Sequence, residues 1–240
     1  MKKTIFSLFL IEKDYKTPLT DRIFLKFQKF FLIKSVRVFT ALLRYLYFSI
    51  FINKKKLGGN KDFIGKEVEK GKDSLEYNFE KIKKSIFVHD RMLNLIRPTL
   101  SVESVLREKQ SQKILSIGPR SESELLLLAA HGFLWRNISA LDLFSYTPKI
   151  TVGDMHKMPF NDNTFDIIFS GWVLAYSDSL KLAMKEKVRV LKNNGIIAFG
   201  HGYKLEGQKE KRIPNEIDEI IKPIKKNVRT IFFKHDIDNQ

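Results

Sequence analysis

The chain has 240 residues, enough for one domain of ordinary size with an added segment. It contains no cysteine, which excludes disulfides, thiol catalysis and cysteine-ligated metals and fits a reducing compartment such as the cytoplasm. The net charge is +16 at pH 7, and residues 1–60 carry 13 Lys and Arg against 3 Asp and Glu. The basic excess therefore belongs to the first quarter of the chain, and the rest is only mildly basic.

The first 60 residues carry two apolar stretches that could be a leader or a membrane span. The start, "MKKTIFSLFLIEKD", has no small-residue cleavage site, and charged residues follow at once, which argues against a secretory signal. The longest apolar stretch, residues 38–52, has 15 residues with Arg44 near its middle. A spanning helix needs ~20, so we expect no span here.

Residues 1–60 mix Phe, Leu and Tyr with cations that recur at intervals of three to seven. A basic face opposite an apolar face is typical of a helix at a membrane interface, and anionic lipid would attract the cations. We therefore expect peripheral contact with the inner membrane surface. A helical cap on the rest of the chain is the alternative. Nucleic-acid binding is a weaker one, because no recognition motif accompanies the charge. The cations are Lys26, Lys29, Lys34, Arg37 and Arg44.

The chain divides into three segments: the basic aromatic region 1–60, a helical linker or cap over 61–110, and an α/β domain over 111–240. In the second segment the apolar residues of "IFVHDRMLNLI" are spaced three and four apart, which predicts a helix. We expect Pro98 to end this helix.

Strand and helix signals alternate from residue 111 onward. Ser121 is expected to cap the first helix with Glu124 reaching back, and Gly132 to follow its end. Short apolar strands with helices between them predict a mostly parallel sheet with helices on both faces. The predicted strands are 113–117, 138–143, 149–154, 165–170, 195–200 and 228–233; the predicted helices are 121–131, 180–191 and 214–226, with a turn at 193–195.

In an open parallel sheet, ligands bind beyond the carboxyl ends of the strands, where the strand order reverses. Gly118-Pro119-Arg120 follows the first strand, Asp142 ends the second, Asp154-Met155 follows the third and Gly171-Trp172 the fourth. Asp142 lies 24 residues after Gly118, near the spacing of the ribose-binding acid of dinucleotide folds. A carboxylate suits that task because it accepts hydrogen bonds from two vicinal hydroxyls.

The segments "ILSIGPRSE", "ALDL", "GDMHKMPFNDNTFDIIFSGWVLAYSD" and "VRVLKNNGIIAFG" resemble the motifs of class I S-adenosylmethionine-dependent methyltransferases, type 11. The resemblance covers about 113–200 and implies a Rossmann-like fold with S-adenosylmethionine as cofactor. It implies that Gly118 forms the first glycine turn and that Asp142 holds the ribose. Asp154 would meet the adenine amino group, the Met155 backbone would meet the ring, and Trp172 would line the methionine end.

The chain departs from this family in three places. The family reads Gly-x-Gly-x-Gly after its first strand, whereas this chain reads Gly118-Pro119-Arg120-Ser121-Glu122. Arg120 either pairs with the methionine carboxylate of the cofactor or fills the pocket, which would leave a non-catalytic scaffold. Only residues 144–149 separate the second and third strands, so a helix is missing or "ITV" is hardly a strand. A single strand signal follows residue 200, which predicts a trimmed fold.

The resemblance implies direct attack of an acceptor nucleophile on the sulfonium methyl group, with the protein aligning the reactants. The acceptor is expected to be a small molecule, a lipid or a glycan intermediate. An RNA methyltransferase with a basic arm is the alternative. Tyr176, His156 and Asp178 are candidate bases by position only. No histidine pair at metal-binding spacing and no Gly-x-Ser-x-Gly elbow is present.

Overall fold

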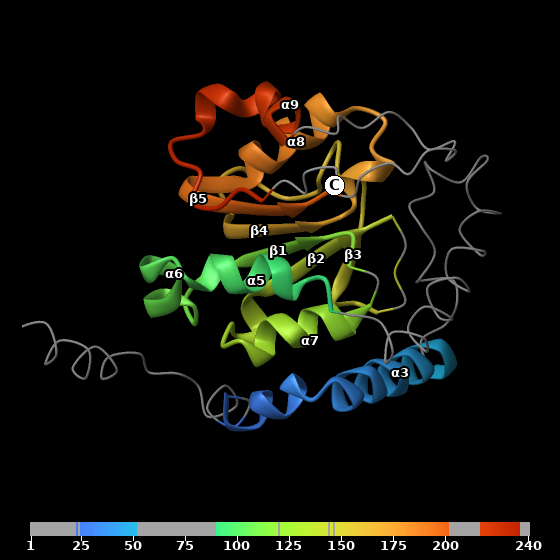
Figure 1. Ribbon diagram of the computed structural model, residues 1–240. Coiled ribbons are helices and arrows are strands. Elements are labelled where there is room, and N and C mark those ends of the chain that lie inside the picture. Colours follow the sequence, from blue (N-terminus) through green and yellow to red (C-terminus); the bar gives the residue numbers. More distant parts are fainter. Residues whose placement is uncertain are drawn as a thin grey trace, which may run out of the picture.

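The computed structural model describes residues 23, 25–51, 90–119, 121–143, 145, 147–201 and 217–235. Five parallel strands form one sheet in the order β3-β2-β1-β4-β5 (Figure 1). The order reverses between β1 and β4, which is where such sheets open a crevice for ligands. The strands are β1 (Ile114–Ile117), β2 (Ile138–Asp142), β3 (Ile150–Val152), β4 (Phe165–Gly171) and β5 (Leu191–Gly200).

Helices cover both faces of this sheet, which confirms the predicted α/β, Rossmann-like fold class. They are α5 (Leu93–Leu100), α6 (Glu103–Glu108), α7 (Glu122–Ala130), α8 (Leu180–Val190) and α9 (Ile217–Ile221), with short 3-10 turns η4 (Trp135–Asn137), η5 (Leu174–Tyr176) and η6 (Lys222–Asn227). An N-terminal layer adds η2 (Gln28–Leu32) and α3 (Lys34–Phe51). None of the described helices is both long and apolar enough to cross a membrane.

Two apolar clusters form the core, one on each face of the sheet. Ile114 of β1 packs with α5 and α7, whereas Leu115, the next residue, packs with α8, α9 and η6. This alternation follows from the two-residue period of a strand. Both faces of the central strands are covered, so all four residues of β1 are buried, the polar Ser116 among them.

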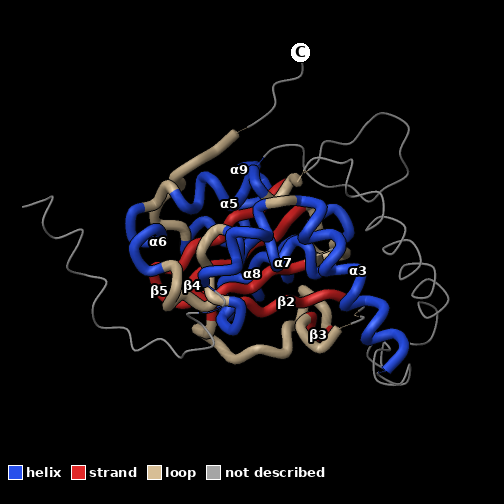
Figure 2. The backbone as a smooth tube through the Cα atoms, turned by 90° about the horizontal axis from the view of Figure 1, so that it is seen from below, coloured by secondary structure: helices blue, strands red, loops and turns tan. Residues whose placement is uncertain are grey.

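Helix α7 is enclosed between the sheet and the N-terminal layer. Eight of its nine residues are buried, because it packs on β2 on one side and contacts both η2 and α3 on the other. Figure 1 shows α7 between the sheet and α3, and Figure 2 views the molecule from the α3 side. The inner face of α3 therefore packs on the α/β domain, as the helical-cap alternative for residues 1–60 expects.

Several sequence predictions need correction. Residues 228–233 form no strand, because no described strand lies beside them to complete the hydrogen bonds. Pro98 does not end its helix but lies within α5, which continues to Leu100. Strand β5 begins at Leu191, and the turn expected at 193–195 is an irregularity inside it, with Asn194 at φ +61°.

Two other expectations hold. The capping residue of α7 is Ser121, whose hydroxyl accepts from the Ser123 amide at 3.2 Å, and Gly132 follows the helix at φ +107°. Residues 150–152 do form a strand, and the described residues between β2 and β3 contain no helix. The connection is thus shortened by loss of its helix. The segment boundaries at residues 60 and 110 stay predictions, as does everything expected of 1–22 and 52–89, which lie outside the described residues.

Candidate functional site

Four of the predicted site positions lie in a row along the carboxyl edge of the sheet. The Gly118 amide donates to the Leu141 carbonyl at 2.8 Å, which brings the turn after β1 beside the end of β2. The Gly153 amide donates to the Asp142 carbonyl at 2.9 Å, which brings the segment after β3 to the other side of Asp142. The fourth position, Trp172, directly follows β4, the strand on the opposite side of β1.

Gly118 is a position that only glycine can occupy without strain. Its φ is +68°, in the left-handed region. A Cβ there would lie 2.6 Å from Cγ2 of Val173, so the turn after β1 packs directly on the turn after β4. This close contact joins the two strand ends at the point where the strand order reverses. Arg120, which stands where the family's motif has its second glycine, lies outside the described residues.

Trp172 also has a left-handed backbone, with φ +57°, which is costly for a bulky residue. Its amide donates to the Gly200 carbonyl at 3.0 Å, and its indole lies against Gly200, where a Cβ would come within 2.9 Å of the ring. The Arg91 guanidinium lies 5.2 Å from the ring centroid, in cation–π range. These contacts hold the strained residue at the end of β4.

Asp154 is held by the residue two positions further on. Its Oδ1 accepts from the His156 backbone amide at 2.9 Å and lies 2.6 Å from His156 Nδ1. His156 Nε2 lies 2.8 Å from the Ser177 hydroxyl and accepts from the Ser179 amide at 3.4 Å. A carboxylate can only accept, so Nδ1 donates and Nε2 is the acceptor of a neutral imidazole. The imidazole thus links the segment after β3 to the segment after β4.

The remaining predicted residues differ in exposure. The Met155 side chain is buried in the core cluster with Leu141 and Met158, so only its backbone faces the edge on which Asp154 lies. Tyr176 is 71% exposed, and Asp178 is exposed as well. Neither side chain is enclosed in a site that excludes water, as we would expect of a general base. Both nitrogens of His156 already have partners, so its geometry is that of a positioning group.

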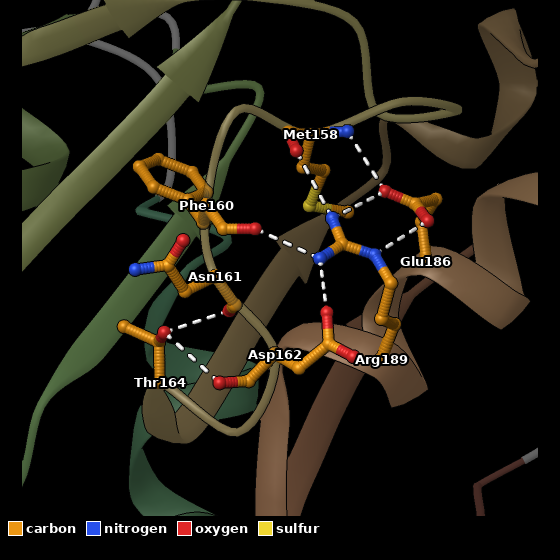
Figure 3. Close-up of polar contacts among 7 residues, drawn as sticks. All are labelled: Met158, Phe160, Asn161, Asp162, Thr164, Glu186 and Arg189. Atoms are coloured by element: carbon orange, nitrogen blue, oxygen red, sulfur yellow. Dashed lines mark hydrogen bonds and ion pairs between the residues drawn. The ribbon is translucent and has the colours of Figure 1, made fainter.

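The loop of the "MPFND" motif is fixed by one arginine of α8 (Figure 3). Arg189 donates to the carbonyls of Met158 at 3.0 Å and Phe160 at 2.8 Å and to the Asp162 carboxylate at 2.7 Å. Glu186 receives two bonds from Arg189, which lowers the pKa of its carboxyl, and accepts the Met158 amide at 2.8 Å. This arginine belongs to the segment "VRVLK", and the sequence alone indicated no role for it. Its contacts explain why the two motifs occur together.

A second residue that sequence reasoning missed is Glu122, in the first turn of α7. Its carboxylate is fully buried and binds Arg44 of α3 through both oxygens. Thr147 donates to Oε1 at 2.5 Å. Burial lowers the pKa of nearby Lys149 to about 8, and Glu122 acts against this shift. A buried carboxylate needs such partners, so Glu122 ties the N-terminal layer to the residues that follow the glycine turn.

The described part of the chain holds no cluster of His, Asp and Glu suited to a metal ion. The arrangement instead offers an edge with two carboxylates and an aromatic ring beside a reversal of strand order. Such an edge binds a nucleoside-containing ligand in proteins of the doubly wound α/β class.

The sequence comparisons agree with this class. Residues 123–199 match the model of a family described as "Methyltransferase domain". The resemblance to class I, type 11 S-adenosylmethionine-dependent methyltransferases is therefore confirmed for this part of the chain.

Curated relatives match over short stretches. A sterol 4-C-methyltransferase of Caenorhabditis elegans is 47% identical over 47 residues, 20% of this chain and 14% of that protein. A malonyl-[acyl-carrier protein] O-methyltransferase of Legionella pneumophila is 41% identical over 46 residues, 19% of this chain and 16% of that protein. The matched stretch thus spans less than a fifth of either relative.

Solved structures are also similar. One is a Haloferax volcanii complex of the Trm112 methyltransferase activator with a putative methyltransferase, at 17% identity and a TM-score of 0.48, covering 65% of this chain and 75% of that one. Another is an S-adenosylmethionine-dependent methyltransferase from Aquifex aeolicus, at 22% identity and a TM-score of 0.41, covering 62% and 86%.

Proposed function

We propose that the chain binds S-adenosylmethionine along the carboxyl edge of the sheet and transfers its methyl group to an acceptor. The observation that carries this proposal is the row formed by Gly118, Asp142 and Asp154 at the edge next to the strand-order reversal. Asp142 would accept from the ribose hydroxyls. Asp154 would accept from the adenine amino group through Oδ2, because Oδ1 is already engaged by His156.

The other proposed contacts follow from position. The Met155 backbone would meet the adenine ring, and Trp172 would line the methionine end next to the Gly118 turn. Arg120 would pair with the methionine carboxylate, because a guanidinium matches that group with two parallel hydrogen bonds. The ligand carries no pyrophosphate, so a turn with one glycine can serve where phosphate-binding turns need several.

Methyl transfer needs little chemistry from the protein. A nucleophile of the acceptor attacks the methyl carbon, the carbon–sulfur bond breaks, and S-adenosylhomocysteine is released. The protein aligns the two reactants and excludes water, a contribution that reaches about 7–11 kcal/mol in well-oriented systems. Among the expected acceptor classes of small molecule, lipid and glycan, we favour a lipid. One matched relative is named for a sterol, and the N-terminal layer carries a large apolar surface.

Calorimetric titration with S-adenosylmethionine and S-adenosylhomocysteine tests the cofactor site. Micromolar binding that Asp142→Ala weakens at least about tenfold, the worth of one or two lost hydrogen bonds to charge, is expected. Arg120→Gly decides the role of that arginine. Weaker binding supports a contact with the cofactor, whereas a gain in binding identifies Arg120 as a plug. If folded wild-type protein bound neither compound, the proposed methyltransferase function would be overturned in favour of a non-catalytic scaffold.

A further inference from the structure

The outer side of residues 23–47 carries a concentrated apolar surface, here named the outer apolar face. Nine of the sixteen large hydrophobic side chains that are exposed among the described residues lie in this short segment. Exposed apolar side chains are normal when scattered, but a contiguous patch marks an interaction site. The members of the outer apolar face are Ile23, Phe27, Phe30, Leu32, Ile33, Phe39, Leu43, Leu46 and Tyr47.

On α3 this surface is a helical stripe. Phe39, Leu43, Leu46 and Tyr47 follow the spacing i, i+4, i+7, i+8 and therefore lie on one side of the helix. Val38 and Ala41, on the other side, are buried. Because α3 already packs on α7 with its inner side, the exposed stripe is a second apolar surface on the same helix. Packing within the described fold does not account for it.

The charges around the outer apolar face have one sign. Residues 22–61 contain no Asp or Glu, and Lys26 and Lys29 are exposed beside Phe27 and Phe30. Two cations of α3 pair with carboxylates elsewhere in the fold. Arg37 binds Asp90 at 2.5 Å and Arg44 binds Glu122. Arg37 and Arg44 are thus engaged in ion pairs with the rest of the fold, and exposed positive charge beside the outer apolar face comes from Lys26 and Lys29 of the preceding segment.

We propose that the outer apolar face docks on an anionic lipid bilayer, with its aromatic and aliphatic side chains among the acyl-chain ends and its lysines at the headgroups. An apolar helix face flanked by lysines, with no acidic residue, fits this surface. Long lysine side chains reach the headgroups while their stems lie on apolar surface. A second copy of the chain fits less well. A symmetric pair would bring Lys26 and Lys29 of both copies together without an acidic partner from this segment.

Docking would also place the candidate site near the lipid. Leu43 on the outer apolar face is followed by Arg44, which binds Glu122, and Glu122 lies two residues beyond Arg120. The start of α7, which follows the turn after β1, is therefore held against α3, and an amphiphilic acceptor would reach the site edge from the plane of the membrane. The idea that the acceptor comes from the lipid rests on the proposed function. The docking of the outer apolar face does not depend on it.

Vesicle flotation with the full chain tests the docking. The vesicles are phosphatidylcholine alone or phosphatidylcholine with about 30% phosphatidylglycerol. The test variant is Phe39→Gln/Leu43→Gln/Leu46→Gln. The control is Phe232→Gln/Leu106→Gln/Leu182→Gln, whose exposed fractions of 66%, 51% and 52% match the 62%, 50% and 46% of the test residues. We expect the test variant to lose binding at least about tenfold and the control to bind as wild type.

A second variant, Lys26→Gln/Lys29→Gln, tests the docking without any change to α3. It should weaken binding to anionic vesicles by about thirtyfold, from about 1 kcal/mol per cation, and leave binding to neutral vesicles unchanged. Circular dichroism verifies that each variant is folded. Wild-type protein that does not float, or apolar and lysine variants that float as wild type, would overturn the proposal. A dimer in light scattering that the apolar variant dissociates would do so as well, because a second copy would then be the occupant. Calorimetry with the cofactor is a separate measurement, so failure of docking and failure of the methyltransferase assignment remain distinguishable.

Discussion

The imidazole of His156 holds the carboxylate of Asp154, with Nδ1 2.6 Å from Oδ1, and its other nitrogen faces the Ser177 hydroxyl at 2.8 Å. The order of carboxylate, imidazole and hydroxyl is that of a hydrolytic triad. However, the Ser179 amide also points at Nε2. The imidazole therefore serves as a bridge between two loops and fixes one oxygen of Asp154, which leaves the other for a ligand.

We expect His156→Ala to weaken S-adenosylhomocysteine binding about tenfold, because Asp154 loses the partner that orients it. His156→Asn should restore part of the affinity, since its amide can donate to the same carboxylate oxygen. His131→Ala is the matched control. Its Nδ1 also makes a bond, to the Leu127 carbonyl at 2.8 Å, but at the far end of α7. Calorimetric dissociation constants provide the measurement, and wild-type affinity in His156→Ala would contradict the positioning role.

Gly118→Ala should lower the free energy of unfolding by about 2–4 kcal/mol, from left-handed strain and overpacking against Val173. Adding Val173→Ala removes the steric part and should recover some of the loss, while the strain remains. Gly171→Ala is the control, because its φ is not positive and its Cβ would meet only the side-chain sulfur of Met92, at 2.8 Å. Urea denaturation measures all four proteins. Equal losses for Gly118→Ala with and without Val173→Ala would refute the contact.

Because Lys187 is buried, we expect the free energy of unfolding to depend on pH. Its side chain is fully buried in α8, and burial lowers its pKa to about 7. Between pH 7 and 10.5 the unfolded chain keeps a proton that the folded chain has released. The free energy of unfolding therefore rises with pH in this window, by about 1.4 kcal/mol per unit for one group. Below pH 7 both states are protonated and the contribution becomes constant.

Lys187→Met should remove this slope and stabilise the protein most at or below pH 7, with a benefit that shrinks toward pH 10. Lys185→Met, an exposed position of the same helix, is the control and should leave the profile unchanged. Denaturant midpoints from pH 6 to 10 give the comparison. Parallel profiles for wild type and Lys187→Met would show that the buried lysine keeps its proton on folding.

The Arg44–Glu122 pair should couple α3 to α7. Arg44→Met leaves a buried carboxylate with fewer partners and should cost about 3 kcal/mol, whereas Arg44→Met/Glu122→Met should cost less. Hydrogen exchange of α3 should increase in the single variant, since the layer loosens locally before the domain unfolds. Arg107→Met removes an exposed pair with Glu103 and serves as the control, with an effect below about 0.5 kcal/mol. Additive costs in the double variant would rule out the coupling.

The central strands, α7 and α8 could be predicted from sequence because buried parallel strands read as short apolar runs and the caps at Ser121 and Ser179 are local signals. The row of residues at the sheet edge followed from topology. The strand predicted at residues 228–233 was wrong because β-branched and aromatic residues favour a strand only where a neighbouring strand pairs with them.

The orientation of α3 could not be derived, because it depends on partners far along the chain. Glu122 lies 78 positions beyond Arg44, and Asp90 lies 53 positions beyond Arg37. One signal was available. The apolar run "ELLLLAA" in α7 is hydrophobic on all sides, which requires a covering layer in addition to the sheet.

The separation of Arg44 and Glu122 also has a consequence for biosynthesis. At 5–20 residues per second, roughly 4–16 s pass between the synthesis of these two residues. During that interval α3 has neither α7 to pack on nor a carboxylate for its arginine, so both of its apolar sides are open to solvent. A nascent chain in this state exposes an amphipathic helix before the α/β domain has folded, so a surface near the ribosome can be the first partner of that helix.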